Sequence, residues 1–207
     1  MRYLKAVLPV LLLITASCGH LHIKPEGKDA LTPEESYRLG AIYESQGEQD
    51  LAMREYLSAA DRGHAAAHFA MANIHIKKAE YKEAESELLK AIETDPSKGA
   101  FYNNIGWVYM ETGRLDKAED AVNKALRSDP AENPAYLDTL GLIQMKSGRF
   151  SEAEKTLSRA ASLAGAGGGE GLAEIYGHLI GLYRKTGEDG KAASIEDKIK
   201  ALKRAAP

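Results

Sequence analysis

The sequence predicts an all-α protein, a right-handed α-solenoid of about five helix–turn–helix hairpins that ends in a C-terminal capping helix. Three observations predict this fold class. Small and apolar residues recur at matched positions every 32 to 39 residues, a glycine separates the two halves of most units, and no convincing period-2 alternation marks a strand. The expected solenoid covers residues 32–205, with units at about 33–64, 65–98, 99–132, 134–167 and 173–205.

Length and composition limit the function. The chain has 207 residues, of which 44% are hydrophobic and 28% charged, and its formal net charge is −3. This composition excludes collagen, an acidic disordered chain and a multi-span membrane protein. The small negative charge gives no electrostatic reason to expect nucleic acid as a partner. The single cysteine excludes a disulfide within the chain.

Residues 1–17 are expected to be a signal peptide. They have two basic residues at the start, an apolar stretch too short to span a bilayer, and small residues before Cys18. The run Ile14-Thr15-Ala16-Ser17-Cys18 resembles the lipobox of bacterial lipoproteins, although that family more often has Leu where this chain has Thr15. The resemblance implies that Cys18 is lipidated and becomes the first residue of the mature chain. The alternatives are an ordinary signal peptide with an incidental cysteine, or a buried N-terminal helix.

Residues 18–31 are expected to form a flexible tether between the membrane and the folded part. From Gly19 to Ala30 the chain has two glycines, one proline and scattered charge without periodicity. The residue after Cys18 is glycine rather than aspartate. By resemblance to the sorting rule of enteric bacteria, this implies a lipid-anchored protein of the cell envelope, in the outer membrane and facing the periplasm.

The first hairpin has a clear start. In Thr32-Pro33-Glu34-Glu35 the threonine is a helix cap, the proline fits the first turn and the second glutamate completes a capping box. Asp95-Pro96 and Asp129-Pro130 are expected to close the second and third units, because proline stops a helix from continuing. The expected turn residues are Gly47, Gly113, Gly148 and Gly187, with Ala79 in the second unit.

Three sets of positions carry the repeat. The anchor pairs are Leu39-Gly40, Met71-Ala72, Ile105-Gly106, Leu140-Gly141 and Leu179-Ile180; the second markers are Tyr43, His75, Tyr109, Gln144 and Tyr183; the third are Ala52, Ala84, Ala118, Ala153 and Ala192. This pattern resembles the tetratricopeptide repeat, a helix–turn–helix unit of 34 residues. The third unit matches it best. The resemblance covers about residues 33–205 and implies a non-catalytic protein that binds other proteins.

Several departures from the repeat carry information. The junction at Ala59–Ala67 lacks a closing proline and resembles the Sel1-type variant of the hairpin, and residues 164–171 insert a glycine-rich loop. In the last unit Glu196 stands where the other units have Tyr56, Leu88, Val122 and Leu157. A charge is tolerable there if no further repeat packs on it, so this helix is expected to cap the solenoid.

The first helices of stacked hairpins line a concave face, which is the expected binding surface. By resemblance, its groove-lining residues are Tyr37, Phe69, Asn73, Ile76, Asn103, Asn104, Trp107, Met110, Asp138, Leu142 and Met145. Apolar side chains with flexible methionines suit a docked peptide or helix. The alternative is that Trp107 and its neighbours pack against the adjacent hairpin. A chaperone-type carboxylate clamp is not expected, because its basic slots hold Phe69, Ala135 and Thr139.

No residue pattern points to catalysis, a metal or a cofactor. The glycine run lacks the Lys-Ser/Thr of a phosphate-binding loop, and His68 and His75 occupy slots that hold Tyr102 and Tyr109 in the third unit. We therefore expect a lipid-anchored adaptor without enzymatic activity or small-molecule substrate, which binds a component of an envelope assembly. It resembles tetratricopeptide lipoproteins such as type IV pilus pilotins, or adaptors for cell-wall enzymes or polysaccharide export. A self-associating structural lipoprotein and an envelope enzyme are the alternatives.

Overall fold

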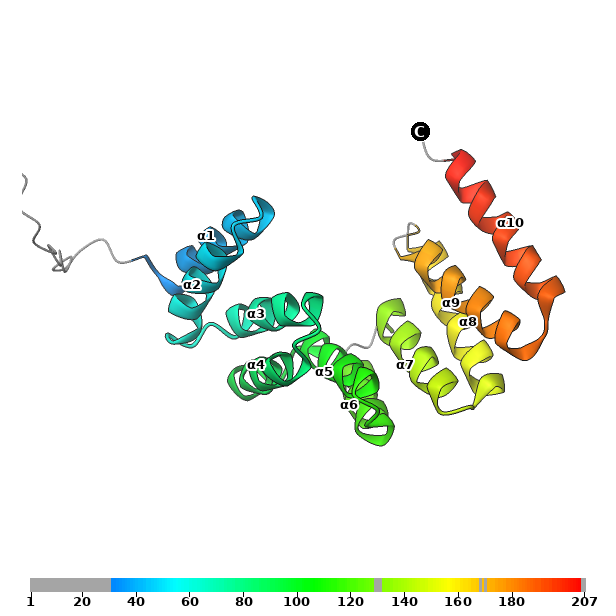
Figure 1. The fold of residues 1–207 in the computed structure, drawn as a ribbon, viewed down its shortest axis with the longest axis horizontal. Helices are drawn as coiled ribbons and strands as arrows, with labels where there is room; N and C mark the ends of the chain where they lie inside the picture. The colour runs from blue at the N-terminus through cyan, green and yellow to red at the C-terminus, as the bar shows by residue number, and fades with distance from the viewer. Residues whose placement is uncertain (1–30, 129–131, 168, 170, 206–207) are drawn as a thin grey trace, which may run out of the picture. The chain divides into compact units, whose positions relative to one another are not determined.

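The computed structural model describes residues 31–128, 132–167, 169 and 171–205, and over these residues it contains ten α-helices and no strand (Figure 1). The helices are α1 (Pro33–Ser45), α2 (Gln49–Ala60), α3 (Ala65–Lys77), α4 (Tyr81–Thr94), α5 (Gly99–Glu111), α6 (Leu115–Ser128), α7 (Pro134–Lys146), α8 (Phe150–Ala166), α9 (Leu172–Thr186) and α10 (Asp189–Ala205). None of these helices is long and apolar enough to cross a membrane. The predicted signal peptide, the lipidated Cys18 and the tether to residue 30 lie outside the described residues.

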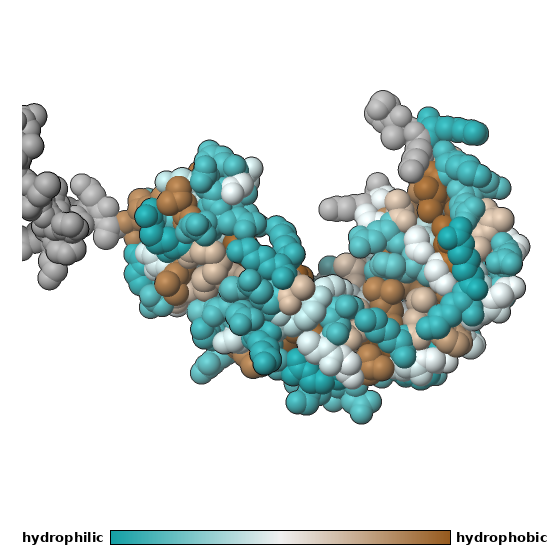
Figure 2. Space-filling model, viewed as in Figure 1, coloured by the Kyte–Doolittle hydropathy of each residue, from teal (hydrophilic) through white to brown (hydrophobic). Residues whose placement is uncertain are grey.

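The helices pack as successive hairpins, which confirms the predicted fold class. Within a hairpin, α1 contacts α2, α3 contacts α4, and so on to α9 with α10. The second helix of each hairpin then packs against the first helix of the next, and the first helices α5, α7 and α9 also touch in sequence. Four clusters of buried apolar residues follow one another along the described helices, so the core runs along the array instead of forming one centre. Most of the visible face is hydrophilic, with apolar patches between the helices (Figure 2).

The helix ends follow the local signals. Glu35 N–H donates to Thr32 Oγ1 at 3.2 Å and Thr32 N–H donates to Glu35 Oε2 at 2.7 Å, which is the predicted capping box. The turn glycines adopt positive φ, a conformation that costs glycine nothing. Ala79 adopts it too, with φ of 57°, and a side chain there is strained. The second hairpin therefore closes on an unfavourable turn residue.

Close approach of the two helices in a hairpin explains the small anchor residues. A Cβ added to Gly40 would lie 2.6 Å from Tyr56, one added to Gly106 2.6 Å from Val122, and one added to Gly141 2.6 Å from Leu157. The bulky positions on the second helices thus face the first helix of their own hairpin.

This packing corrects the expected reason for Glu196. That residue occupies the bulky position, which faces its own hairpin and not a following repeat. In the last hairpin the large side chain lies on the first helix, because Ile180 stands where other hairpins have glycine or alanine, and it is 9% exposed. Glu196 instead accepts a hydrogen bond from Arg184 at 2.5 Å.

Ion pairs link neighbouring hairpins at a repeated position. Arg114 contacts Glu85 at 2.7 Å, Arg149 contacts Glu119 at 2.6 Å, and Lys191 contacts Glu154 at 2.7 Å. In each pair the carboxylate lies on one hairpin and the cation at the start of the second helix of the next. Exposed pairs of this kind contribute little to stability, so they set the register of the stack more than its stability.

Candidate functional site

A cleft between the first two hairpins brings together four of the predicted groove residues: Tyr37, Phe69, Asn73 and Ile76. Its volume is about 450 Å³, and Ala41, Glu44, Tyr56, Ala70 and Lys77 complete its lining. Every lining residue except Tyr56 comes from α1 or α3. Helical spacing explains this, because residues three and four apart on adjacent first helices share one face.

The walls of this cleft are aromatic and its rim is charged. The ring of Tyr37 lies 5.7 Å from that of Tyr56, and the ring of Phe69 lies 5.0 Å from that of Phe101 behind it. At the rim Lys77 Nζ donates to Glu44 Oε1 at 2.8 Å, and Tyr56 O–H donates to Glu44 Oε2 at 2.9 Å. Burial and the neighbouring carboxylate raise the pKa of Tyr56. Burial opposes ionisation of Glu44, but the hydrogen bonds from Lys77 and Tyr56 lower its pKa overall, so Glu44 stays ionised.

A chain of asparagine amides leads from this cleft toward α5. Asn104 Nδ2 donates to Asn73 Oδ1 at 2.7 Å, which joins α5 to α3. Asn103 Nδ2 lies 3.5 Å from Asn104 Oδ1. Among the described residues the Oδ1 atom of Asn103 has no hydrogen-bond partner and is shielded from solvent. Because this atom is shielded from solvent, it is an uncompensated polar atom inside the fold and not a contact point on the surface.

The predicted centre of the groove is partly core. Met110 is 2% exposed and lies in a core cluster with Val122 and Ile143, so the expectation that it lines the groove is wrong. Trp107 is half-buried and packs edge-on against Tyr81 at 5.9 Å. Met110 and Trp107 therefore pack against neighbouring helices, as the alternative to the groove expected. Leu142 and Met145 of α7 are also half-buried against core clusters.

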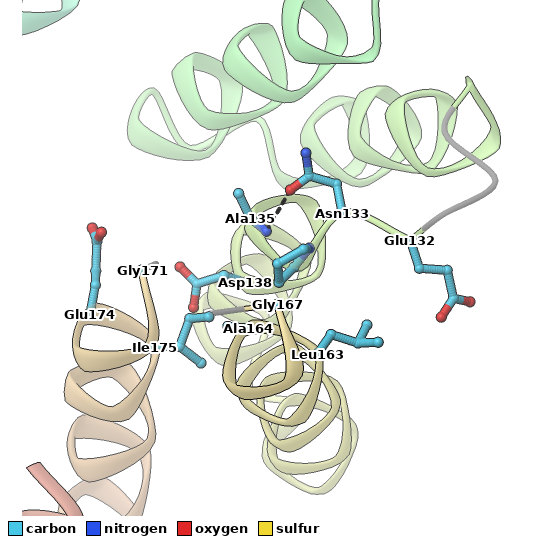
Figure 3. A pocket seen from close by; sticks show the side chains of 11 residues that line it. Glu132, Asn133, Ala135, Asp138, Leu163, Ala164, Gly167, Gly171, Glu174 and Ile175 are labelled. Atoms are coloured by element: carbon cyan, nitrogen blue, oxygen red, sulfur yellow. Dashed lines mark hydrogen bonds between the residues drawn. The ribbon is translucent and has the colours of Figure 1, made fainter. Parts of the chain in front are cut away.

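A second cleft, of about 720 Å³, lies between α7, α8 and α9 (Figure 3). Only Asp138 of the predicted residues belongs to it. The remaining lining residues are Glu132, Asn133, Pro134, Ala135, Leu163, Ala164, Gly167, Gly171, Glu174 and Ile175. Figure 3 shows the Asp138 carboxylate directed toward α9. The glycine-rich insertion at 164–171, which the sequence predicts as a loop between repeats, is the signal of this cleft in the sequence.

Asp138 is paired with a histidine of the next hairpin. It is 9% exposed, and its Oδ1 lies 2.8 Å from His178 Nδ1 on α9. This hydrogen bond raises the pKa of His178, although burial opposes the shift. The pair therefore joins α7 to α9, and the predicted role of Asp138 in contacting a partner competes with this structural contact.

Among the described residues, His64, His68 and His75 are each paired with a glutamate as well. His68 Nδ1 lies 2.7 Å from Glu87 and His75 Nδ1 lies 2.7 Å from Glu80. Within the described ranges no group of three or more His, Cys, Asp or Glu side chains is arranged to hold a metal ion. The chemistry that this surface offers is recognition through apolar contact and hydrogen bonding.

Comparisons with known proteins agree with this architecture. A family model described as tetratricopeptide repeat matches residues 69–133. The solved structure of MamA from Desulfovibrio magneticus RS-1, from residue 41 to its end, is 15% identical, with a TM-score of 0.67 over 84% of this chain and 96% of that one. BtubC from P. vanneervenii is 16% identical, with a TM-score of 0.70 over 83% of this chain and 80% of that one.

YrrB, a tetratricopeptide repeat protein described as having an unusual peptide-binding site, is 18% identical, with a TM-score of 0.59 over 83% of this chain and 87% of YrrB. No curated protein sequence matches the chain. Identities this low show the fold alone. The family match covers residues 69–133, and together these findings agree with the predicted tetratricopeptide repeat fold.

Proposed function

We propose that this chain is a membrane-anchored, non-catalytic adaptor of the bacterial cell envelope, which binds a peptide or helix of a partner protein on its first helices. The observation that carries the proposal is the cleft of about 450 Å³ between α1 and α3. YrrB, which shares the fold, is described as having a peptide-binding site, and that description supports a comparable role here.

The chemistry of the cleft suits a protein segment. Aromatic and aliphatic walls with a few polar groups at the rim are typical of sites that bury one or two anchor side chains. The Glu44–Lys77 pair supplies both signs of charge at the edge. A partner with an aromatic or aliphatic anchor flanked by polar residues would satisfy both features.

The membrane location rests on the sequence. A basic start, a short apolar stretch and the lipobox-like run ending at Cys18 support lipid anchoring, and Gly19 supports the outer membrane with the repeats facing the periplasm. In that place the adaptor would serve an outer-membrane, secretion or pilus assembly, the last as pilotin-like lipoproteins do. Neighbouring components of such an assembly are the partners to test first.

Site-specific photo-crosslinking in cells with the full chain tests the binding face. Ala41 is exposed and lines the cleft, so a photoreactive amino acid at this position should crosslink a partner protein. Leu89 on α4 is 48% exposed and lies outside the cleft, which makes it a matched control position. Equal crosslinking from Ala41 and Leu89, or none from Ala41, would move the site away from α1 and α3.

A further inference from the structure

The outermost hairpins expose positions that are buried everywhere else in the array. Ile42 on α1 is 51% exposed. Its equivalents in the other four hairpins, three residues after each anchor, are at most 1% exposed: Ile74, Val108, Ile143 and Leu182. Those side chains are buried where a first helix packs against the preceding hairpin, and among the described residues no hairpin precedes α1. The exposure of Ile42 therefore marks one half of an inter-hairpin contact that lacks its partner.

Two other positions are small or apolar in the remaining hairpins but carry opposite charges at the two ends of the array. Glu35 on α1 stands where the later hairpins have Ala67, Phe101, Tyr136 and Ile175. Lys200 on α10 stands where the earlier hairpins have Ala60, Ile92, Leu126 and Ala161. At three of the four internal junctions the residues at these two positions belong to one core cluster: Ala60 with Ala67, Leu126 with Tyr136, and Ala161 with Ile175. The two sides of one apolar contact thus become a carboxylate at one end and an ammonium at the other.

The net charge of the helical hairpins also differs between the two ends of the array. Residues 33–60 contain six acidic and two basic residues, which gives −4, whereas residues 172–205 contain five acidic and seven basic residues, which gives +2. The three hairpins between them, counted over 65–94, 99–128 and 134–166, carry −1, 0 and +1. One end of the array is therefore acidic and the other basic, and α1 and α10 lie at these two ends (Figure 1).

We propose that copies of this chain stack head to tail, with α1 of one copy packed against α10 of the next. In this arrangement α10 takes the place that the second helix of a preceding hairpin has at the internal junctions, Glu35 faces Lys200, and Ile42 is buried in the contact. Contacts of two α1 ends or two α10 ends would bring like charges together. A contact between different surfaces does not close on itself, so stacking produces open chains of copies and not only dimers.

The contact is weak and salt-sensitive. Lys200 has a side chain that is 63% exposed and already contacts Asp197 at 2.9 Å, while Glu35 Oε2 is engaged by Thr32 and its Oε1 is open to a partner. Exposed ion pairs contribute little and are screened by salt. Ile42 supplies the apolar part. The association should therefore appear at high protein concentration, or where copies are concentrated on one surface.

Sedimentation velocity on residues 31–207, which form one compact unit containing all the described helices, tests the proposal. Concentrations up to about 1 mM at low salt are suitable for a weak contact. The average mass should rise with concentration and fall when salt is added. A mass that stays monomeric over this range would overturn the proposal.

Complementary blocking variants test the direction of the contact. Ile42→Glu blocks only the α1 end, and Lys200→Glu blocks only the α10 end, so each variant alone should stay monomeric. Their mixture should form a heterodimer and nothing larger, because one intact end of each kind remains. Association of either variant alone would show a different interface and would refute head-to-tail stacking.

Leu89→Glu provides the control for nonspecific apolar association. Leu89 is 48% exposed, close to the value for Ile42, but it lies on α4 away from both ends. This variant should stack like the wild type. If it dissociates as Ile42→Glu does, the association is general hydrophobic contact and the proposal fails. Far-UV circular dichroism and thermal melting of each variant establish that it is folded, and crosslinking at Ala41 should persist in Ile42→Glu because the cleft is a separate surface.

Discussion

Replacing Gly106 by alanine should destabilise the protein, although alanine is the better helix former. The added Cβ would lie 2.6 Å from Val122 Cγ2 and 3.1 Å from the carbonyl oxygen of Ala118. Val122 is fully buried and, as a β-branched residue in a helix, has essentially one rotamer, so it cannot turn aside. The backbone oxygen cannot move either unless α5 and α6 separate.

The magnitude follows from two opposing effects. Overpacking a well-filled core costs about 1–3 kcal/mol, and replacing glycine by alanine within a helix contributes about 1 kcal/mol in the other direction. Because both the rigid valine and the backbone resist displacement, the cost lies in the upper part of its range. The expected net loss in the free energy of unfolding is about 1–2 kcal/mol.

Gly177 offers a matched control in the same fold. It lies within α9, is exposed, and a Cβ added there would have no atom within 4 Å. Gly177→Ala should therefore stabilise the protein by about 0.5–1 kcal/mol through backbone entropy alone. Urea unfolding followed by circular dichroism compares both variants with the wild type. If Gly106→Ala stabilises as much as Gly177→Ala does, the close approach of α5 and α6 is not a constraint and the explanation of the anchor glycines is wrong.

Three further predictions concern a turn, a histidine and the anchor. Ala79→Gly should raise the free energy of unfolding by about 1 kcal/mol, because it relieves a positive φ of 57°; an unchanged urea midpoint would contradict this. The hydrogen bond that His178 donates to Asp138 raises the pKa of His178, so its stabilisation is fully present below the unfolded-state pKa of about 6.5 and is lost as pH rises through the higher folded pKa. Stability should fall across this window, and His178→Gln, which does not titrate, should show a smaller fall; an identical fall would contradict the assignment. Cys18→Ser should abolish metabolic labelling with a fatty acid, and persistent labelling would exclude the proposed anchor.

The hairpins could be predicted because their signals are local. The capping box at Thr32 and Glu35, the turn glycines and the repeated small anchors each act within a few residues, and the structure contains each of them. A repeat also multiplies the signal, since five approximate copies constrain one another more than one copy would. The cleft between α1 and α3 was predictable for the same reason, as it needs only a shared face on two adjacent helices.

Features that depend on rotation and on contacts across hairpins were not predictable. Met110 lies three residues after Trp107, so helical spacing places both near one face, yet Met110 is 2% exposed within a core cluster while Trp107 is half-buried. In the last hairpin the bulky residue, Ile180, stands on the first helix, and Glu196 stands at the position that is bulky in the other hairpins. The sequence could not predict this arrangement, because it does not show that the bulky position faces the first helix of its own hairpin. The second cleft depends on how α7, α8 and α9 diverge around the glycine-rich insertion, and periodicity carries no information about that divergence.

The two proposed surfaces, the cleft between α1 and α3 and the stacking contact between α1 and α10, both involve the first hairpin. The binding cleft lies on the first helices, and head-to-tail stacking would bring the first helix of one copy into line after the last hairpin of another. Stacking would therefore extend one recognition face across several copies without covering the cleft between α1 and α3. A partner with repeated binding segments would gain avidity from such a chain, because each additional segment binds at a high effective concentration. The Ile42→Glu variant separates the effects, since it should keep crosslinking through Ala41 to a single segment and lose only the added affinity for a multivalent partner.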